Sequence, residues 1–250
     1  MLPVWLMPFA LGFFLILVRC TSLIMVAPIF SARTIPPLVR LGFSVPVAVA
    51  VYVGAGMPIF GGWERLPELF AAVAMEVVLG IGAGFCARFA ADAAQGAGSA
   101  IALAMGMSFG SEIDPLHGAQ SSAISDLLAF LTMAVALAAG LHREAIAWLC
   151  RSVREVPPGA DVPLATIATR VIADGTESFA LAVRLGFPML AAATLGHLGL
   201  GLLNRAAPQL NLSHIGFSVA LVAGGVAFYL VGPKAAVLAA QAARTAFAGH

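Results

Sequence analysis

Long apolar runs separated by short polar connectors dominate the pattern of this chain. A helix that crosses a bilayer needs about 20 mostly apolar residues, and about six stretches meet that length. They are residues 3–28, 41–58, 69–89, 124–141, 179–203 and 212–232. A seventh apolar run, residues 97–109, is too short to cross a bilayer. The pattern therefore predicts an all-α, membrane-associated protein.

The longest connector, residues 142–177, is predicted to form two short amphipathic helices, because apolar residues recur in it at helical spacing. The two stripes are Ile146, Leu149, Cys150 and Val153, and then Leu164, Ile167, Ala168 and Val171. Pro157 and Pro158 end the first helix, since proline lacks the backbone N–H that a helix needs. Such helices lie on a membrane surface or pack on a partner helix, and the pattern favours neither.

The composition places the outer surface of the protein against lipid or other apolar protein. Hydrophobic residues make up 61% of the chain and charged residues 10%, whereas soluble domains carry roughly 25% charged residues. The net charge of +1 and the lack of a basic cluster argue against nucleic-acid binding. The three cysteines lack the spacing of a metal site, and the five histidines are scattered. We therefore expect no catalytic residues, no metal and no cofactor.

Five charged residues lie within the apolar runs or near their ends, and Arg19, Glu76 and Arg184 are the candidates for buried charges, while Arg88 and Asp126 could lie near helix ends. A charge at bilayer depth is costly and tends to face protein or water and to find a partner. One interpretation is a path for ions or substrate. The other is that these helices are buried in a protein assembly, where salt bridges between helices set their register.

A polar segment stands between the last two apolar runs. Its notable members are Asn204, Arg205, Pro208, Gln209 and Asn211. Amides and a guanidinium beside apolar surface need hydrogen-bond partners. The segment is either an ordered joint between helices or subunits, or a helix cap and turn at a membrane surface.

A glycine-rich segment at residues 105–120 follows the third apolar region. Its distinctive residues are Met105, Gly106, Met107, Phe109, Gly110, Asp114 and Pro115. Glycine permits unusual backbone angles, and methionine provides a deformable apolar contact. The segment is either a loop that closes a pore against ions or the simple end of a short buried helix.

Five segments, in order along the chain, resemble the FliR family, the flagellar member of the type III secretion export gate. They are residues 19–40, the Glu76, Gly80 and Gly84 pattern, residues 106–115, residues 140–157 and residues 204–211. Leu141 stands where the family often has histidine, and Ser218 where it often has proline. The match covers nearly the whole chain, and the segment at 204–211 is its most specific part.

The resemblance implies a single export-gate subunit domain over residues 1–250, whose helices pack as hairpins in a larger export-gate assembly. It would conduct unfolded flagellar proteins across the bacterial inner membrane, at the flagellar basal body. The implied partners are the P and Q gate subunits, the B switch component, exported polypeptides and membrane lipid. Residues 105–120 would be the plug of the channel.

Two alternative functions remain open at this point. An injectisome export gate uses a closely related subunit. A secondary transporter for a small solute should show matching broken helices in its two halves. Pro188 interrupts one apolar run, but the first half of the chain has no counterpart.

Overall fold

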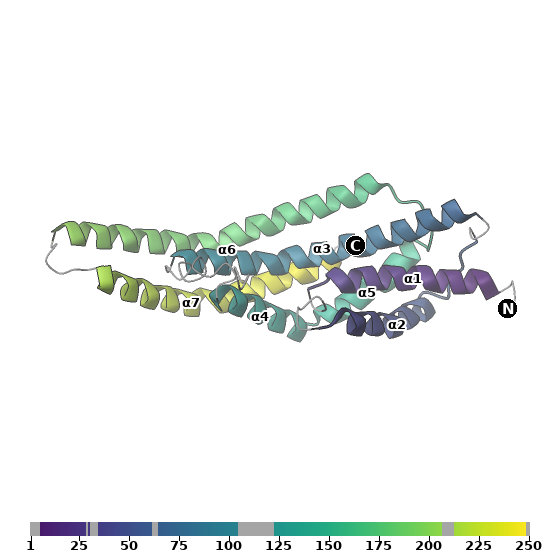
Figure 1. Cartoon of the computed structure of the whole chain (residues 1–250), viewed down its shortest axis with the longest axis horizontal. Coiled ribbons are helices and arrows are strands. Elements are labelled where there is room, and N and C mark those ends of the chain that lie inside the picture. The colour runs from purple at the N-terminus through teal and green to yellow at the C-terminus, as the bar shows by residue number, and fades with distance from the viewer. Residues whose placement is uncertain are drawn as a thin grey trace. The chain divides into compact units, whose positions relative to one another are not determined.

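Helices form nearly all of the computed structural model, which describes residues 6–28, 30, 35–61, 65–104, 123–206 and 213–248. Within those ranges there are seven α-helices and no β-strand (Figure 1). They are α1 (Met7–Val26), α2 (Pro37–Gly54), α3 (Leu66–Ala104), α4 (Ala123–Ala138), α5 (Leu141–Glu155), α6 (Leu164–Ala206) and α7 (Ser213–Ala248). The prediction of an all-α fold with long apolar helices is confirmed.

Proline and glycine set several of the helix ends. α2 begins at Pro37, directly after Pro36. Proline suits the first turn, because the N–H that it lacks would have no partner within the helix there. α5 follows Gly140, whose φ of 88° is a backbone conformation that glycine adopts without strain. α5 then ends at Glu155, just before Pro157 and Pro158, as the sequence predicts.

Two helices are longer than the apolar runs that predicted them. α3 has 39 residues and joins the runs at 69–89 and 97–109. α6 has 43 residues and includes both the second amphipathic stripe and the run at 179–203. The prediction of a separate short helix before residue 179 is therefore wrong. Hydropathy falls within both joining stretches, but a fall in hydropathy does not by itself end a helix. Alanine, the strongest helix former, is frequent between residues 90 and 96.

Internal prolines do not break the last two helices. α6 continues through Pro188 and α7 through Pro233. An internal proline removes one backbone hydrogen bond and strains the preceding turn, and the turns on either side can still hold the helix. The expected end of the last apolar run at residue 232 is therefore not a helix end.

Three of the described helices are long and apolar enough to cross a membrane. They are Met7–Val26, Pro37–Gly54 and Leu66–Ala102, with mean hydropathies of 2.3, 1.6 and 2.1. A fourth crossing results if the bent pair Ser125–Ala138 and Leu141–Glu155 forms one span. The runs predicted at 179–203 and 212–232 fall on the longer helices α6 and α7.

Contacts divide the chain, which its sequence predicts to be one domain, into two compact units. Unit 1 contains Met1–Phe89, Leu137–Gly175 and Ala242–His250, and unit 2 contains Ala90–Ala136 and Thr176–Gln241. The helices α3, α6 and α7 each contribute residues to both units.

In unit 1, α1 and α2 form a helical hairpin. The buried stripe of α2 consists of Ser44, Ala48 and Val51. Thr21 of α1 donates a hydrogen bond of 2.9 Å to the hydroxyl of Ser44. At the other end of the hairpin, the Tyr52 hydroxyl donates to the carbonyl oxygen of Phe9 at 3.1 Å. These contacts pair the end of one helix with the start of the other, so the two helices run antiparallel.

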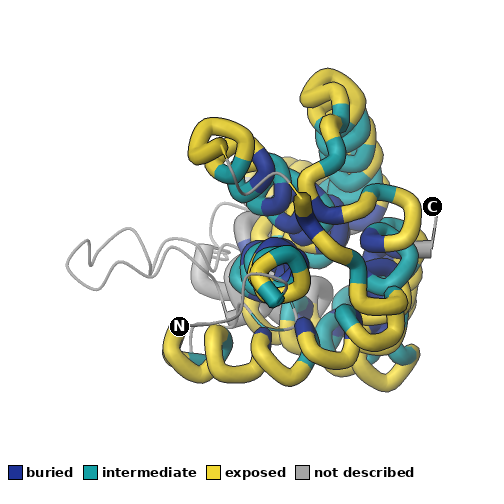
Figure 2. Tube along the Cα trace, turned by 90° about the vertical axis from the view of Figure 1, so that its right-hand side faces the viewer, coloured by how far each residue is buried: buried dark blue, intermediate teal, exposed yellow. Residues whose placement is uncertain are grey.

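In unit 2, a cluster of mostly small buried residues joins the end of α3 to α4, α6 and α7. Its members are Ala94, Ala97, Leu128, Leu185, Ala235, Ala236 and Ala239. Small residues allow helix axes to approach closely, which strengthens packing where lipid or partner protein replaces water. Figure 2 shows that buried and exposed positions alternate around the helical turns.

Candidate functional site: a buried ion pair between helices

Arg19 of α1 and Glu76 of α3 form a fully buried ion pair in unit 1. Their exposed fractions are 0% and 1%. The pair is bidentate: Nε of Arg19 lies 2.5 Å from Oε2 of Glu76, and a terminal nitrogen donates to Oε1 at 3.0 Å. This fork geometry is the strongest form of a charge-assisted hydrogen bond. The two buried charges thus pair within the chain.

Three further groups satisfy the remaining polar atoms of the pair. The Arg19 guanidinium donates to the Ser152 hydroxyl at 3.2 Å and to the carbonyl oxygen of Val156 at 3.0 Å. Oε1 of Glu76 accepts a hydrogen bond from the Gly159 backbone N–H at 3.3 Å. A buried ion pair is tolerated only when such additional bonds compensate for lost hydration.

The pair also holds both ends of the turn that follows α5. Arg19 binds the carbonyl oxygen of Val156, and Glu76 binds the N–H of Gly159. Between them, Pro157 and Pro158 have no N–H to offer. Gly159 has a φ of 79°, and an added Cβ would collide with the ring of Phe60. The turn is therefore fixed by two opposite charges and by a glycine that no other residue replaces without strain.

Glycines let α1 approach α3 beside the ion pair. A Cβ at Gly80 would collide with the Ser22 hydroxyl and would come within 2.5 Å of the carbonyl oxygen of Arg19. One turn further, a Cβ at Gly84 would lie 2.9 Å from Cβ of Val26. The spacing of four residues matches the small-residue faces of closely packed membrane helices. The close approach brings the Arg19 side chain within reach of Glu76.

Two arginines of α5 bind backbone carbonyls at the ends of two other helices of unit 1. Arg154 donates to the carbonyl oxygen of Gly54, the last residue of α2, at 2.7 Å. Arg151 donates to the carbonyl oxygen of Phe247, near the end of α7, at 2.7 Å. The last carbonyl groups of a helix lack partners within it and carry partial negative charge, so a guanidinium suits them.

Most of the apolar face of α5 is covered by the chain itself, whereas Ile146 of the predicted stripe is exposed. Its buried residues are Leu141, Ala145, Trp148, Leu149 and Val153. The ring of Trp148 contacts that of Phe247, with centroids 6.3 Å apart. The sequence did not decide whether this amphipathic helix lies on a membrane surface or packs on a partner helix. In the structure it packs within unit 1.

This arrangement is suited to holding helices together. Each charge of the pair is bonded and shielded, so neither offers a free atom to a substrate or an ion. No group of three or more His, Cys, Asp or Glu side chains that could hold a metal occurs among the described residues. The network joins α1, α3 and α5, which lie far apart in the sequence.

The other predicted site residues are placed differently. Arg184 is exposed on α6 within this chain, so its burial in an assembly stays a prediction. Its helix buries the neighbouring Leu185 instead. Arg205 is exposed in the last turn of α6, which also contains Asn204. The remaining predicted residues of the polar joint, Pro208, Gln209 and Asn211, and the whole candidate plug, residues 105–120, lie outside the described residues.

Sequence reasoning missed the residues that complete the network. No pattern in the sequence assigns a bonding role to Ser152, Gly159, Arg151 or Arg154. One signal was present, because the helix at 141–155 carries many charged residues beside a narrow apolar stripe, and such charges need partners. Its partners were not predictable, because they lie up to 137 positions away in the sequence.

An all-helical chain with membrane-length helices and a shielded charge pair has the properties of an integral component of a membrane assembly. The chain belongs to the bacterial export proteins, family 1, whose profile matches residues 10–245. It is similar to the flagellar biosynthetic protein FliR of Escherichia coli K12, with 30% identity over 211 residues, covering 83% of this chain and 79% of that protein.

Two further relatives carry the same name. The FliR of Pectobacterium carotovorum subsp. carotovorum is 29% identical over 218 residues, which cover 85% of this chain and 80% of the relative. The FliR of Bacillus subtilis strain 168 is 26% identical over 209 residues, which cover 82% and 80% respectively. The resemblance to this family that the sequence motifs indicate is therefore confirmed.

Proposed function

We propose that this chain is a structural channel subunit of the flagellar type III protein-export gate, which conducts unfolded flagellar proteins across the bacterial inner membrane. The observation that carries the proposal is the family match over residues 10–245, together with relatives named as flagellar biosynthetic proteins. The role is structural rather than enzymatic. The proposed partners are the P and Q gate subunits and the B switch component.

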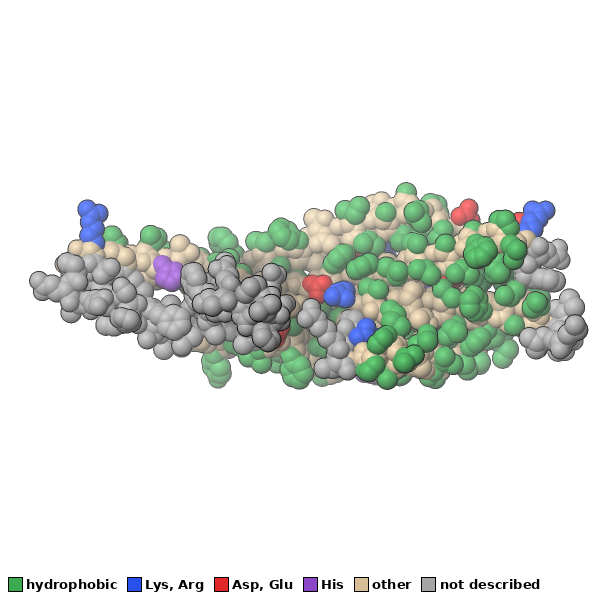
Figure 3. All heavy atoms as spheres, viewed as in Figure 1, with side chains coloured by type: hydrophobic (Ala, Val, Ile, Leu, Met, Phe, Trp, Pro, Cys, Tyr) green, Lys and Arg blue, Asp and Glu red, His purple; other side chains and the backbone are tan. Residues whose placement is uncertain are grey.

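The exposed surface supports a role in an assembly. Large apolar side chains remain exposed on several helices, among them Leu38 of α2, Phe130 of α4 and Tyr229 of α7, at 74–80% of their full area. Hydrophobic side chains are also spread widely over the face seen in Figure 3. Exposed apolar patches of this kind mark surfaces for protein or membrane contact. A subunit that packs against partner helices and lipid needs an apolar surface of this kind.

The buried ion pair supports the same role from inside the chain. It fixes α1, α3 and the turn after α5 relative to one another within unit 1. A gate subunit must present rigid helices to its neighbours while a polypeptide passes. A pair of compensated charges specifies one packing among many similar apolar ones.

The test is deletion of the gene in the bacterium that encodes this chain, followed by measurement of swimming and of flagellar proteins in the culture medium. We expect the deletion to abolish both, and plasmid-borne wild-type chain to restore them. The chain should also co-purify with the P and Q subunits when the three are expressed together.

Each alternative has a distinct outcome. A strain that keeps its flagella but stops secreting injectisome substrates would assign the chain to an injectisome. A purified chain that is stable without partners and catalyses uptake of a small solute into vesicles would make it a transporter and would refute the export proposal.

A further inference from the structure

Proline stands inside three of the described helices. The internal prolines are Pro46 of α2, Pro188 of α6 and Pro233 of α7. A proline has no N–H, so the carbonyl oxygen four residues earlier in the helix loses its usual hydrogen-bond donor. The residues that carry these three carbonyl groups are Gly42, Arg184 and Tyr229. Each of these helices therefore has one backbone acceptor that its own ladder of hydrogen bonds does not serve.

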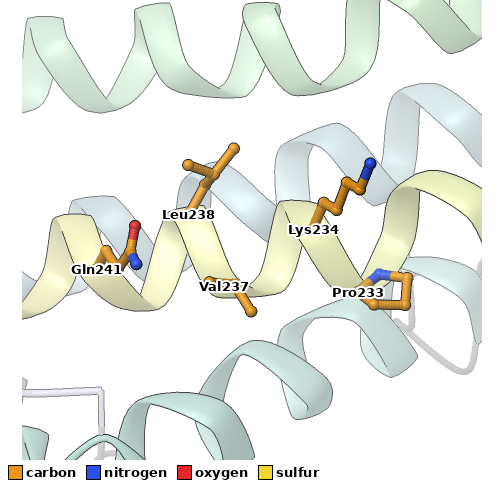
Figure 4. Close-up of a pocket in the computed structure, with 5 residues that line it drawn as sticks. All are labelled: Pro233, Lys234, Val237, Leu238 and Gln241. Atoms are coloured by element: carbon orange, nitrogen blue, oxygen red, sulfur yellow. The ribbon is translucent and has the colours of Figure 1, made fainter.

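All three prolines, and all three residues that carry the freed carbonyl groups, are exposed. Pro233, for example, lines an open groove of about 490 Å³ in unit 2 (Figure 4). None of the described side chains donates a hydrogen bond to any of the three carbonyl oxygens. Membrane helices tolerate an internal proline where neighbouring helices, hydroxyl side chains or water serve the freed carbonyl. Within the described part of the chain, no side chain has that role.

The hydroxyl group of α2 is already used on the inner side of the hairpin with α1. Ser44 is the one serine or threonine of α2, and it is buried. Its hydroxyl donates to the carbonyl oxygen of Leu41 at 2.7 Å and accepts a hydrogen bond from Thr21 at 2.9 Å. The freed carbonyl of Gly42 therefore needs a donor from another molecule.

The surroundings of Gly42 indicate what covers this carbonyl. The exposed residues at helical spacing around it are apolar, namely Leu38, Val45 and Val49. A Cβ built on Gly42 has nothing within 4 Å, so this part of the surface is open. Lipid acyl chains have no donor to offer. A bound water needs two to four polar partners, which apolar side chains do not provide. A side chain of another protein, with an O–H or N–H group, meets both conditions.

We propose that the outer face of α2 docks a helix of a neighbouring P or Q subunit, whose Ser, Thr, Asn or Gln side chain donates to the Gly42 carbonyl oxygen. We define the outer face of α2 by its exposed residues Leu38, Gly42, Val45, Pro46 and Val49. This inference rests on the proposed function and adds the chemistry of one contact. The apolar residues provide contact area. The donor fixes the register of the two helices, because a buried carbonyl without a donor is costly in any other register.

The experiment uses the full chain expressed with the P and Q subunits and purified through a tag on this chain. Pro46→Ala returns an N–H to α2, which then serves the Gly42 carbonyl within the helix. We expect the amount of this chain in the membrane to stay equal or to rise. Recovery of the contacting subunit should fall about fivefold, as for one lost hydrogen bond. A proline that served only the fold of α2 would cause no such fall.

A matched control and a double-variant cycle separate the hydrogen bond from a change in the shape of α2. Pro37→Ala replaces an exposed proline in the first turn of the same helix, where no N–H is needed, and should leave recovery unchanged. A photoreactive benzoylphenylalanine at position 45 should cross-link to P or Q and locate the donor residue. Changing that donor to alanine should lower recovery about fivefold with the wild-type chain. It should cause no further loss with Pro46→Ala, because both changes remove the same bond.

The outcomes distinguish this inference from the proposed function. Co-purification of the wild type with unchanged recovery for Pro46→Ala would overturn the inference and leave the function standing. Additive losses in the double-variant cycle would also overturn it, since the two residues would then act independently. Cross-linking to phospholipid in place of protein would overturn it and make the outer face of α2 a lipid surface. Failure of the wild type to co-purify with either subunit would remove both.

Discussion

Arg151 of α5 donates a hydrogen bond of 2.7 Å to the backbone carbonyl oxygen of Phe247, which lies 96 positions later near the end of α7. The contact is reinforced by the rings of Trp148 and Phe247 and by the ion pair of Glu144 with Arg244. The end of α7 is thereby attached to α5 by three neighbouring contacts of different kinds.

Loss of this attachment should release the end of α7. In Arg151→Ala, the carbonyl of Phe247 loses a charged donor, which is worth about 1.5 kcal/mol or about a tenfold change in local opening. We expect a protease site appended after His250 to be cut about tenfold faster. Arg143→Ala removes an exposed arginine of the same helix and serves as the control. The protease should cleave this variant at the wild-type rate.

Breaking the buried pair should destabilise unit 1 strongly. Arg19→Met leaves the Glu76 carboxylate buried with the Gly159 N–H as its remaining bond from this network. The expected loss is about 3–5 kcal/mol in unfolding free energy. The double variant Arg19→Met with Glu76→Leu should recover a large part of that loss, because no charge is then left unpaired. Denaturation of the purified complex in detergent measures all three, and equal losses for the single and double variants would contradict the interpretation.

A methyl group at Gly80 should separate α1 from α3. Gly80→Ala places Cβ against the Ser22 hydroxyl and the Arg19 carbonyl oxygen, so backbone must shift at a cost of about 1–3 kcal/mol. Gly42→Ala in α2 is the matched control, since nothing lies within 4 Å of its added Cβ. That control should be neutral or slightly stabilising, because alanine favours helix. Thermal unfolding of the two variants tests this. A lower melting temperature for Gly80→Ala alone shows that the close approach of the helices is responsible, whereas similar shifts in both variants would indicate helix propensity.

Removal of the proposed plug should make the gate leak. Apolar side chains in a pore hold back hydrated ions, which do not shed water cheaply there. We expect deletion of residues 106–120 to raise leakage of small ions in cells and to slow growth, while the complex still assembles. Unchanged leakage from a correctly assembled complex would return the segment to the simple end of a helix.

Loss of Arg205 should weaken assembly. Its side chain is exposed in the last turn of α6, where a partner subunit can reach it. Arg205→Ala is expected to lower the yield of the P–Q complex severalfold, and Arg205→Lys to restore part of it, since lysine keeps the charge but not the planar fork. Normal assembly with abolished export would instead assign Arg205 to conduction.

The sequence predicts the helical class because apolar periodicity determines it directly. It also points to Arg19 and Glu76, since charges inside apolar runs stand out. It does not predict that α3 and α6 are continuous. Hydropathy indicates whether a residue faces apolar or polar surroundings, whereas helix propensity decides whether the helix continues, and the two are separate properties. The sequence does not show which side of α6 packs against the core, a side that leaves Arg184 exposed within this chain. It does not find Ser152 or Gly159, whose roles exist only once distant segments meet.

The ion pair also has a consequence for biosynthesis. Arg19 emerges from the ribosome 57 residues before Glu76 and 137 before Val156. At about 5–20 residues per second, the guanidinium waits roughly 3–11 s for its carboxylate and longer for the turn. During that interval the Arg19 charge is unmatched, and a charge inside an apolar helix tends to face water or protein. The order of synthesis therefore sets how long α1 carries its charge without the partner that unit 1 later provides.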